Sequence, residues 1–148
     1  MKLGKLKPFL IETDVLVAAM DPEDPHHSEA IDVIVVADNC FLSPYALMEL
    51  DLLIRSGNIK VRNLQLFWRK LLDTLNHYSI YVAMPSPLHY AEAAKLRTLY
   101  ELTYFDSLHA ATAIIEGKPL VSFDERAYSN VRNLRYVHPS RLRTEARG

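Results

Sequence analysis

Five acidic residues of this 148-residue chain stand beside or within apolar segments, where an ionised side chain is costly unless something compensates it. They are Glu12, Asp14, Glu49, Asp106 and Asp124. Carboxylate ligands without supporting cysteines favour Mg²⁺ or Mn²⁺ over zinc or copper. Such cation sites commonly handle phosphates, because the metal neutralises phosphoryl oxygens and lowers the pKa of an attacking water.

The first two acids interrupt the apolar run PFLIETDVLV, residues 8–17, which predicts a fully buried strand. Glu12 and Asp14 have i, i+2 spacing, so they share a face if the strand is still regular or lie on its exit turn if it has ended. A cation would compensate their charge. The alternative is an ordinary polar strand end.

Glu49 lies in the apolar stripe of a helix that is predicted to start at Ser43-Pro44, with the serine as N-cap and the proline at the first helical position. Its neighbours on that stripe include Tyr45 and Leu53. A core-facing carboxylate usually has a partner or a function. The alternative is a buried acid satisfied by an arginine or a backbone amide.

Asp106 and Asp124 are each expected at a helix N-terminus, where capping alone would explain an aspartate. Asp124 also follows the strand-like segment PLVSF. The five acids together are stronger evidence for a cation site than any one of them, because strand carboxyl ends and helix N-termini converge on one crevice in a parallel α/β sheet.

Short apolar segments alternate with amphipathic ones along the chain, which predicts an α/β domain with a central, mainly parallel sheet covered on both faces. The expected strands are 8–17, 40–43, 78–84, 118–124 and 135–138, and the expected helices are 26–37, 44–55, 60–76, a segment from 86 onward, 106–116 and 125–130.

The composition fits one domain over residues 1–148, with a core at about 8–138 and a basic tail at 139–148. Residues 1–51 carry a net charge of −7 and the remainder +6, which suits a cation site in the first third and phosphate contacts elsewhere, although both could be solvated surfaces. No apolar run is long enough to span a bilayer and no secretory signal is evident, so we expect a cytoplasmic protein with no membrane contact. The lone Cys40 is compatible with a reducing compartment.

Other sites for chemistry are weaker. The four glycines form neither a GxGxxG motif nor a P-loop, which excludes nucleotide binding by those loops. The histidines His26, His27 and His109 lack the HExxH spacing of a zinc site, and structural or surface roles are favoured for them.

Four segments in this order resemble the motifs of PIN domains, and within them the VapC-like toxins of prokaryotic toxin–antitoxin pairs. FLIETDVLVAAM resembles the first acidic strand, SPYALMELDLLI the second-acid helix through Glu49, YFDSLHAATAI the third-acid helix through Asp106, and LVSFDERAY the last acidic turn through Asp124. The resemblance covers residues 9–138. Ser122 stands where the family commonly has Thr or Ser before the last acid.

The resemblance implies a three-layer α/β/α fold and Mg²⁺- or Mn²⁺-dependent hydrolysis of RNA. Glu12 and Asp106 would hold the principal metal, Asp14 and Glu49 would assist directly or through water, and Asp124 would support a second metal or position the nucleophilic water. Ser122 would orient carboxylates or bind water. The resemblance further implies an RNA substrate, an antitoxin partner and a homodimer.

One departure from the family pattern bears on activity. Glu12 stands where the family keeps its first aspartate, so the ligand geometry must shift by one methylene or Asp14 must take over. A degenerate PIN domain acting as an RNA- or protein-binding module is therefore the main alternative. A response-regulator-like receiver also gathers acids at strand ends, but YSIYVAM ends in no acid and LVSF in no lysine.

Overall fold

The computed structural model describes residues 8–36 and 39–142 of the chain. Of the basic tail expected at 139–148, residues 143–148 lie outside the described part. No helix among the described residues is long and apolar enough to cross a membrane.

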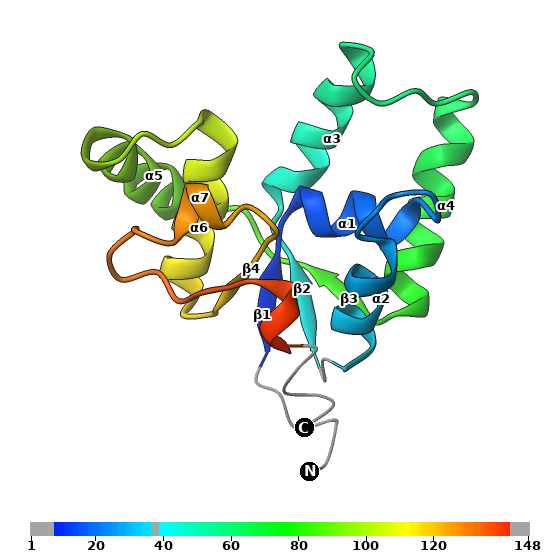
Figure 1. The fold of residues 1–148 in the computed structure, drawn as a ribbon. Helices are drawn as coiled ribbons and strands as arrows, with labels where there is room; N and C mark the ends of the chain where they lie inside the picture. Colours follow the sequence, from blue (N-terminus) through cyan, green and yellow to red (C-terminus); the bar gives the residue numbers. More distant parts are fainter. Residues whose placement is uncertain (1–7, 37–38, 143–148) are drawn as a thin grey trace.

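A five-stranded sheet, parallel throughout, forms the centre of the molecule (Figure 1). Its strands are β1 (Phe9–Ile11), β2 (Cys40–Leu42), β3 (Ile80–Val82), β4 (Leu120–Val121) and β5 (Tyr136–Val137), in the spatial order β3-β2-β1-β4-β5. The expected α/β class with a central parallel sheet is confirmed.

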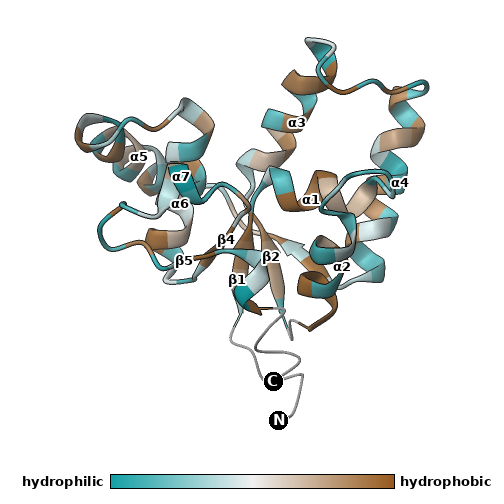
Figure 2. Ribbon diagram, in the orientation of Figure 1, coloured by the Kyte–Doolittle hydropathy of each residue, from teal (hydrophilic) through white to brown (hydrophobic). Residues whose placement is uncertain are grey.

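Successive residues of the central strands alternate between two separate apolar cores, because strand side chains point to opposite faces in turn. Phe9 and Ile11 belong to one core and Leu10 to the other. Val121 and Leu120 divide in the same way. Figure 2 shows the apolar colouring concentrated on these strands. Both faces are therefore covered, which gives the three layers expected of an α/β/α fold.

The helices pack on both faces of this sheet (Figure 1). They are α1 (Thr13–Met20), α2 (His27–Val36), α3 (Tyr45–Arg55), α4 (Leu64–His77), α5 (Pro87–Leu99), α6 (Tyr104–Glu116) and α7 (Glu125–Tyr128). Apolar residues of α1, α2 and α4 fill the core on one face, and those of α5, α6 and α7 fill the core on the other. Buried side chains of α3 contribute to both.

The prediction of a strand over residues 8–17 is wrong in its second half. The strand ends at Ile11, and the apolar residues after Glu12 form the buried helix α1. Periodicity cannot separate a buried strand from a buried helix within a continuous apolar run. Glu12 is the residue at which the backbone changes from one to the other.

Two predicted helix caps are also corrected. Pro44 rather than Ser43 is the N-cap of α3, and the Ser43 hydroxyl contacts His109 instead of capping the helix. Thr103 caps α6 by accepting a hydrogen bond from the Asp106 amide, so Asp106 lies within the first turn and does not serve as the cap.

The chain order places β2 on one side of β1 and β4 on the other, so the connections run in opposite directions from β1. Such a topological switch point leaves a crevice beyond the carboxyl ends of the two strands. Ile11 and Val121 are paired at these ends, which brings Glu12 and Ser122 to the mouth of the crevice.

Candidate metal centre

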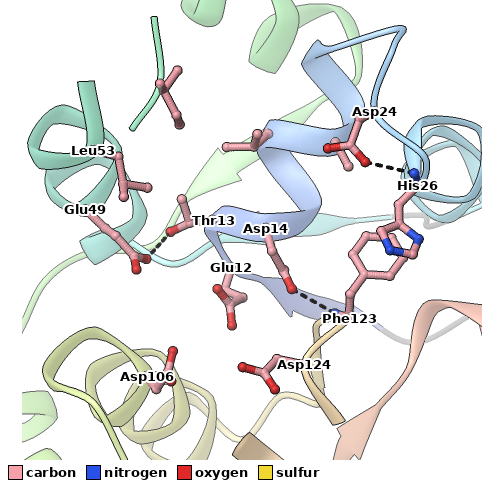
Figure 3. A pocket seen from close by; sticks show the side chains of 13 residues that line it. Glu12, Thr13, Asp14, Asp24, His26, Glu49, Leu53, Asp106, Phe123 and Asp124 are labelled. Atoms are coloured by element: carbon pink, nitrogen blue, oxygen red, sulfur yellow. Dashed lines mark hydrogen bonds between the residues drawn. The ribbon is translucent and has the colours of Figure 1, made fainter. Parts of the chain in front are cut away.

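A pocket of about 390 Å³ lies at this switch point (Figure 3). All five predicted acids line it, together with Asp24 from the loop between α1 and α2. They reach the pocket from the end of β1, from α1, α3 and α6, and from the turn after β4. No lysine or arginine of the described residues lines it, so the pocket concentrates negative charge.

Glu12 lies deepest among these acids, with 5% of its surface exposed. Its Oε2 accepts hydrogen bonds from the Tyr128 hydroxyl at 2.6 Å and from Ser122 Oγ at 3.1 Å. Its Oε1 lies 4.0 Å from His109 Nε2. Burial raises the pKa of Glu12 above its usual value, although the charge of His109 and the Tyr128 hydrogen bond act in the opposite direction.

Asp14 points from the first turn of α1 toward the end of β4 (Figure 3). Its Oδ2 accepts hydrogen bonds from Ser122 Oγ and from the Phe123 amide, both at 2.9 Å. Burial and the charge of Glu12 raise the pKa of Asp14 to about 8. Its Oδ1 is buried and has no hydrogen-bond partner among the described residues.

Glu49 is held from two sides at the pocket edge. Thr13 Oγ1 donates to its Oε1 at 2.5 Å, and His109 Nε2 lies 2.9 Å from the same oxygen. Burial acts to raise the pKa of Glu49, but the hydrogen bonds from His109 and Thr13 outweigh it and leave the pKa below its usual value. Its environment therefore favours the ionised form of Glu49, in contrast to that of Glu12, whose pKa is raised.

His109 is fully buried on α6 and lies between Glu49 and Ser43, whose hydroxyl is 2.7 Å from Nδ1. Burial acts to lower its pKa, but the hydrogen bond to Glu49 and the charges of Glu12 and Glu49 raise it overall. In the imidazolium that this favours, both ring nitrogens donate hydrogen bonds. His109 then compensates part of the acid cluster's charge.

Asp106 and Asp124 complete the pocket wall opposite α1 (Figure 3). Asp106 Oδ1 lies 3.2 Å from the Tyr128 hydroxyl, and burial raises the pKa of Asp106. Asp124 is exposed and caps α7 by accepting a hydrogen bond from the Ala127 amide at 3.1 Å. The capping expected for Asp124 is confirmed, and the same residue also lines the pocket.

Ser122 connects the two acids at the end of β1. Its hydroxyl lies within hydrogen-bond distance of Glu12 and Asp14, and it accepts a hydrogen bond from the Asp124 amide at 3.0 Å. A single hydroxyl hydrogen can serve one of the two carboxylates at a time. Ser122 therefore lies where a residue that orients carboxylates must be.

The residues present fit a hard divalent cation. The pocket offers carboxylate oxygens from separate elements, and one of them, Asp14 Oδ1, is buried without a partner among the described residues. Ligand atoms of Glu12, Glu49 and His109 also lie within 4.8 Å of one another. Because His109 Nε2 is already engaged by Glu49, oxygen ligation, which Mg²⁺ and Mn²⁺ prefer, is the better match.

Three residues of the site were missed or undervalued at the sequence level. His109 was expected to have a structural or surface role, and it contacts the acid cluster directly. Tyr128 was not singled out, and it contacts both Glu12 and Asp106. Asp24 lies in a proline-rich loop without periodicity. The spacing of His109 three residues after Asp106, one helical turn on, was the one available signal.

Comparison with known proteins gives one family match. The family model described as the PIN domain matches residues 9–134. Among curated protein sequences, none gives a significant match.

Several solved structures share the fold at low sequence identity. VapBC2 from Rickettsia felis, bound to a DNA fragment from its promoter, is 19% identical with a TM-score of 0.68, covering 89% of this chain and 98% of that one. A toxin-antitoxin complex from Klebsiella pneumoniae is 16% identical with a TM-score of 0.65, covering 88% and 97%. DNA-bound VapBC from Salmonella typhimurium is 14% identical with a TM-score of 0.64, covering 90% and 99%.

Proposed function

Because the chain belongs to the PIN domain family, we propose that it is a Mg²⁺- or Mn²⁺-dependent endoribonuclease that hydrolyses RNA phosphodiester bonds. The observation that carries this proposal is Asp14 Oδ1, which has no hydrogen-bond partner in the described part of the chain and is buried in a pocket lined by six acids. Leaving a carboxylate oxygen buried and unpaired is costly, and a cation removes that cost.

In this proposal Glu12 and Asp106 hold the principal cation, and Asp14 and Glu49 assist directly or through water. The cation, when bound, would neutralise phosphoryl oxygens and lower the pKa of an attacking water. Asp124, exposed at the pocket wall, would support a second cation or accept a hydrogen bond from that water. Ser122 would keep the carboxylates of Glu12 and Asp14 in place.

The test is RNA cleavage by the purified protein with Mn²⁺, with Mg²⁺ and with a chelator, together with a Mn²⁺ titration. We expect cleavage that depends on the divalent cation and is lost in Asp106→Asn while circular dichroism shows an intact fold. Asp73→Asn, which neutralises an exposed carboxylate on α4, is the matched control and should leave cleavage unchanged. Retained cleavage in Asp106→Asn would contradict the assignment.

We further propose that the chain is the toxin of a toxin–antitoxin pair. A second depression, of about 770 Å³, lies beside the acid pocket and shares Val17 and Ile59 with it. Its wall includes the apolar side chains of Met20, Leu66 and Phe67. An apolar segment of an antitoxin would bury these side chains and could enter the acid pocket.

The partner to test is the product of an adjacent open reading frame that encodes a short protein with a DNA-binding N-terminus. Co-expression should yield a stable complex in which cleavage is inhibited. Leu66→Glu, at a side chain that is 46% exposed, should weaken this complex and leave cleavage by the free protein intact. An unchanged complex would place the antitoxin elsewhere.

The second candidate function is a catalytically degenerate PIN domain that binds RNA or protein. Glu12, at the position where an aspartate is expected, is the observation that favours it. A Mn²⁺ titration separates the two, because a protein that binds no Mn²⁺ at millimolar concentration would favour the binding module.

Two further expectations belong to the same proposal. A homodimer should appear as concentration-dependent mass in light scattering. We also expect the protein to act in the cytoplasm, where RNA substrates are available. Its single cysteine, Cys40, suits that reducing compartment, because it is buried as a thiol whose pKa burial raises to about 12.

A further inference from the structure

Tyr128 links the two acids that are proposed to hold the principal cation. It is the last residue of the four-residue helix α7 and is fully buried. Its hydroxyl donates to Glu12 Oε2 at 2.6 Å and lies 3.2 Å from Asp106 Oδ1. A phenol carries one hydrogen, so the shorter contact identifies Glu12 as the main acceptor.

The length of the Glu12 side chain is what makes this contact possible. Glu12 is the N-cap residue of α1, and its backbone is fixed by β1 on one side and by the helix on the other. Its Oε2 accepts from Tyr128 and lies 3.1 Å from Ser122 Oγ, which leaves Oε1 on the side of the pocket where His109 and Glu49 lie. An aspartate on the same backbone would end about 1.5 Å earlier, one carbon–carbon bond short.

We propose that Tyr128 is a positioning residue matched to Glu12: its hydroxyl anchors Oε2, so that the longer side chain presents Oε1 to the divalent cation. The proposal rests on the proposed metal site and concerns how this chain builds it. It accounts for Glu12 at a position where the motif has aspartate, because the extra methylene is taken up by a specific donor. Glu12 is then a working ligand and no sign of degeneration.

If Tyr128 acts through Glu12, substitutions of the two residues should have non-additive effects on cation binding. Tyr128→Phe keeps the ring and removes the donor, so Glu12 loses its shortest hydrogen bond. Glu12→Asp withdraws the acceptor and leaves the Tyr128 hydroxyl buried without it. Once either change is made, the other has little left to remove. Partners that orient metal ligands typically contribute roughly 10–100-fold to metal affinity.

The experiment is a double-mutant cycle on Mn²⁺ affinity, measured by titration calorimetry on the full chain, with the thermal midpoint of the metal-free protein recorded for each variant. The proteins are the wild type, Glu12→Asp, Tyr128→Phe and the double variant. We expect each single change to weaken Mn²⁺ binding by roughly 10-fold or more, and the double variant to bind no more weakly than Glu12→Asp.

Tyr45→Phe is the matched control. Tyr45 is also a buried tyrosine, at 2% exposure, and its hydroxyl contacts His89 instead of a carboxylate of the acid pocket. A purely structural role for Tyr128 predicts a lowered thermal midpoint in both Phe variants and unchanged Mn²⁺ affinity in both. That outcome would overturn the proposal, as would losses that multiply in the double variant.

Two further outcomes are distinguishable. If the wild type binds no Mn²⁺, the proposed function fails and the pairing fails with it; if the wild type binds Mn²⁺ and the cycle is additive, the pairing alone fails. Should Glu12→Asp not fold, the contrast in Mn²⁺ affinity between Tyr128→Phe and Tyr45→Phe still decides.

Discussion

Two fully buried histidines in this molecule have nearly the same surroundings and different consequences. His89 on α5 contacts the Tyr45 hydroxyl through Nδ1 at 2.8 Å and Glu116 through Nε2 at 2.9 Å. His109 on α6 contacts the Ser43 hydroxyl through Nδ1 at 2.7 Å and Glu49 through Nε2 at 2.9 Å. Each forms a hydroxyl–histidine–glutamate chain that joins separate helices or loops.

The difference lies in the charges beyond the glutamate. Glu116 is 36% exposed in its side chain and faces solvent, whereas Glu49 faces a pocket that also holds Glu12 and Asp106. A buried histidine between a hydroxyl and a carboxylate does not by itself mark the site, because His89 has the same partners away from the acid pocket. What marks the site is a surplus of carboxylates that one histidine cannot neutralise.

The largest expected contrast is in cleavage. Asp106→Asn should reduce the RNA cleavage rate by more than about 100-fold, beyond the effect typical of residues that only support ligands. Glu116→Gln, in the His89 chain, should leave the rate within about twofold. Single-turnover rates at saturating Mn²⁺ measure both. Equal losses in the two variants would mean that the His89 chain also serves the chemistry.

The next effect is stabilisation by the cation. Mn²⁺ at 100 times its dissociation constant should raise the free energy of unfolding by about 2.7 kcal/mol, because it binds the folded state alone. The increase should persist in His89→Ala and disappear in Asp106→Asn. Urea denaturation with and without Mn²⁺ gives the values. A full increase in Asp106→Asn would place the cation away from the acid pocket.

Replacing each histidine by alanine should affect stability alike and Mn²⁺ affinity differently. Both variants lose about 1–3 kcal/mol of stability, because buried partners are left without hydrogen bonds. Mn²⁺ affinity should fall roughly 10–100-fold in His109→Ala, since Glu49 loses its support, and stay unchanged in His89→Ala. Calorimetric titration of both variants checks this. Equal affinities would show that His109, too, only holds helices together.

Measured per pH unit, the smallest expected effect is the change in stability of the metal-free protein with pH. Burial raises the pKa of Asp14 to about 8, so the folded state favours its protonated form. The stability that this provides is present below the unfolded pKa and is lost as the pH rises toward 8. The metal-free protein should therefore become less stable between about pH 4 and 8, by at most about 1.4 kcal/mol per pH unit for one proton.

Urea denaturation across this pH range measures the slope. Asp14→Asn removes one titrating group and should make the decline shallower, while Glu12 and Asp106, whose pKa burial also raises, still titrate. Saturating Mn²⁺ should remove the decline in the wild type. If the stability of the metal-free wild type instead rose steadily toward pH 8, the raised pKa of Asp14 would be contradicted.

Most strands and helices could be predicted in order because the apolar periodicity of a strand or a helix is visible within a short stretch of sequence. The prediction failed where the deciding contacts lie far away in the chain. The run after Glu12 is equally apolar in a strand or a buried helix, and only packing against α2 and α3 decides. The acids were found because charge in an apolar stripe is conspicuous. Their roles as ligands stay a prediction.

Tyr128 and His109 were harder to find for a physical reason. A buried tyrosine or histidine is an ordinary core residue, and nothing in its sequence neighbours indicates which group its polar atom contacts. The partners lie far away in the chain, 116 residues for Tyr128 with Glu12 and 60 for His109 with Glu49. Only the assembled sheet reveals them.

The same separation has a consequence for synthesis. Chains emerge N-terminus first at about 5–20 residues per second, so roughly 6 to 23 s pass between the translation of Glu12 and that of Tyr128. During this interval the first acids exist without the residues that hold them. A growing chain therefore cannot assemble the complete acid pocket until Tyr128 has been translated.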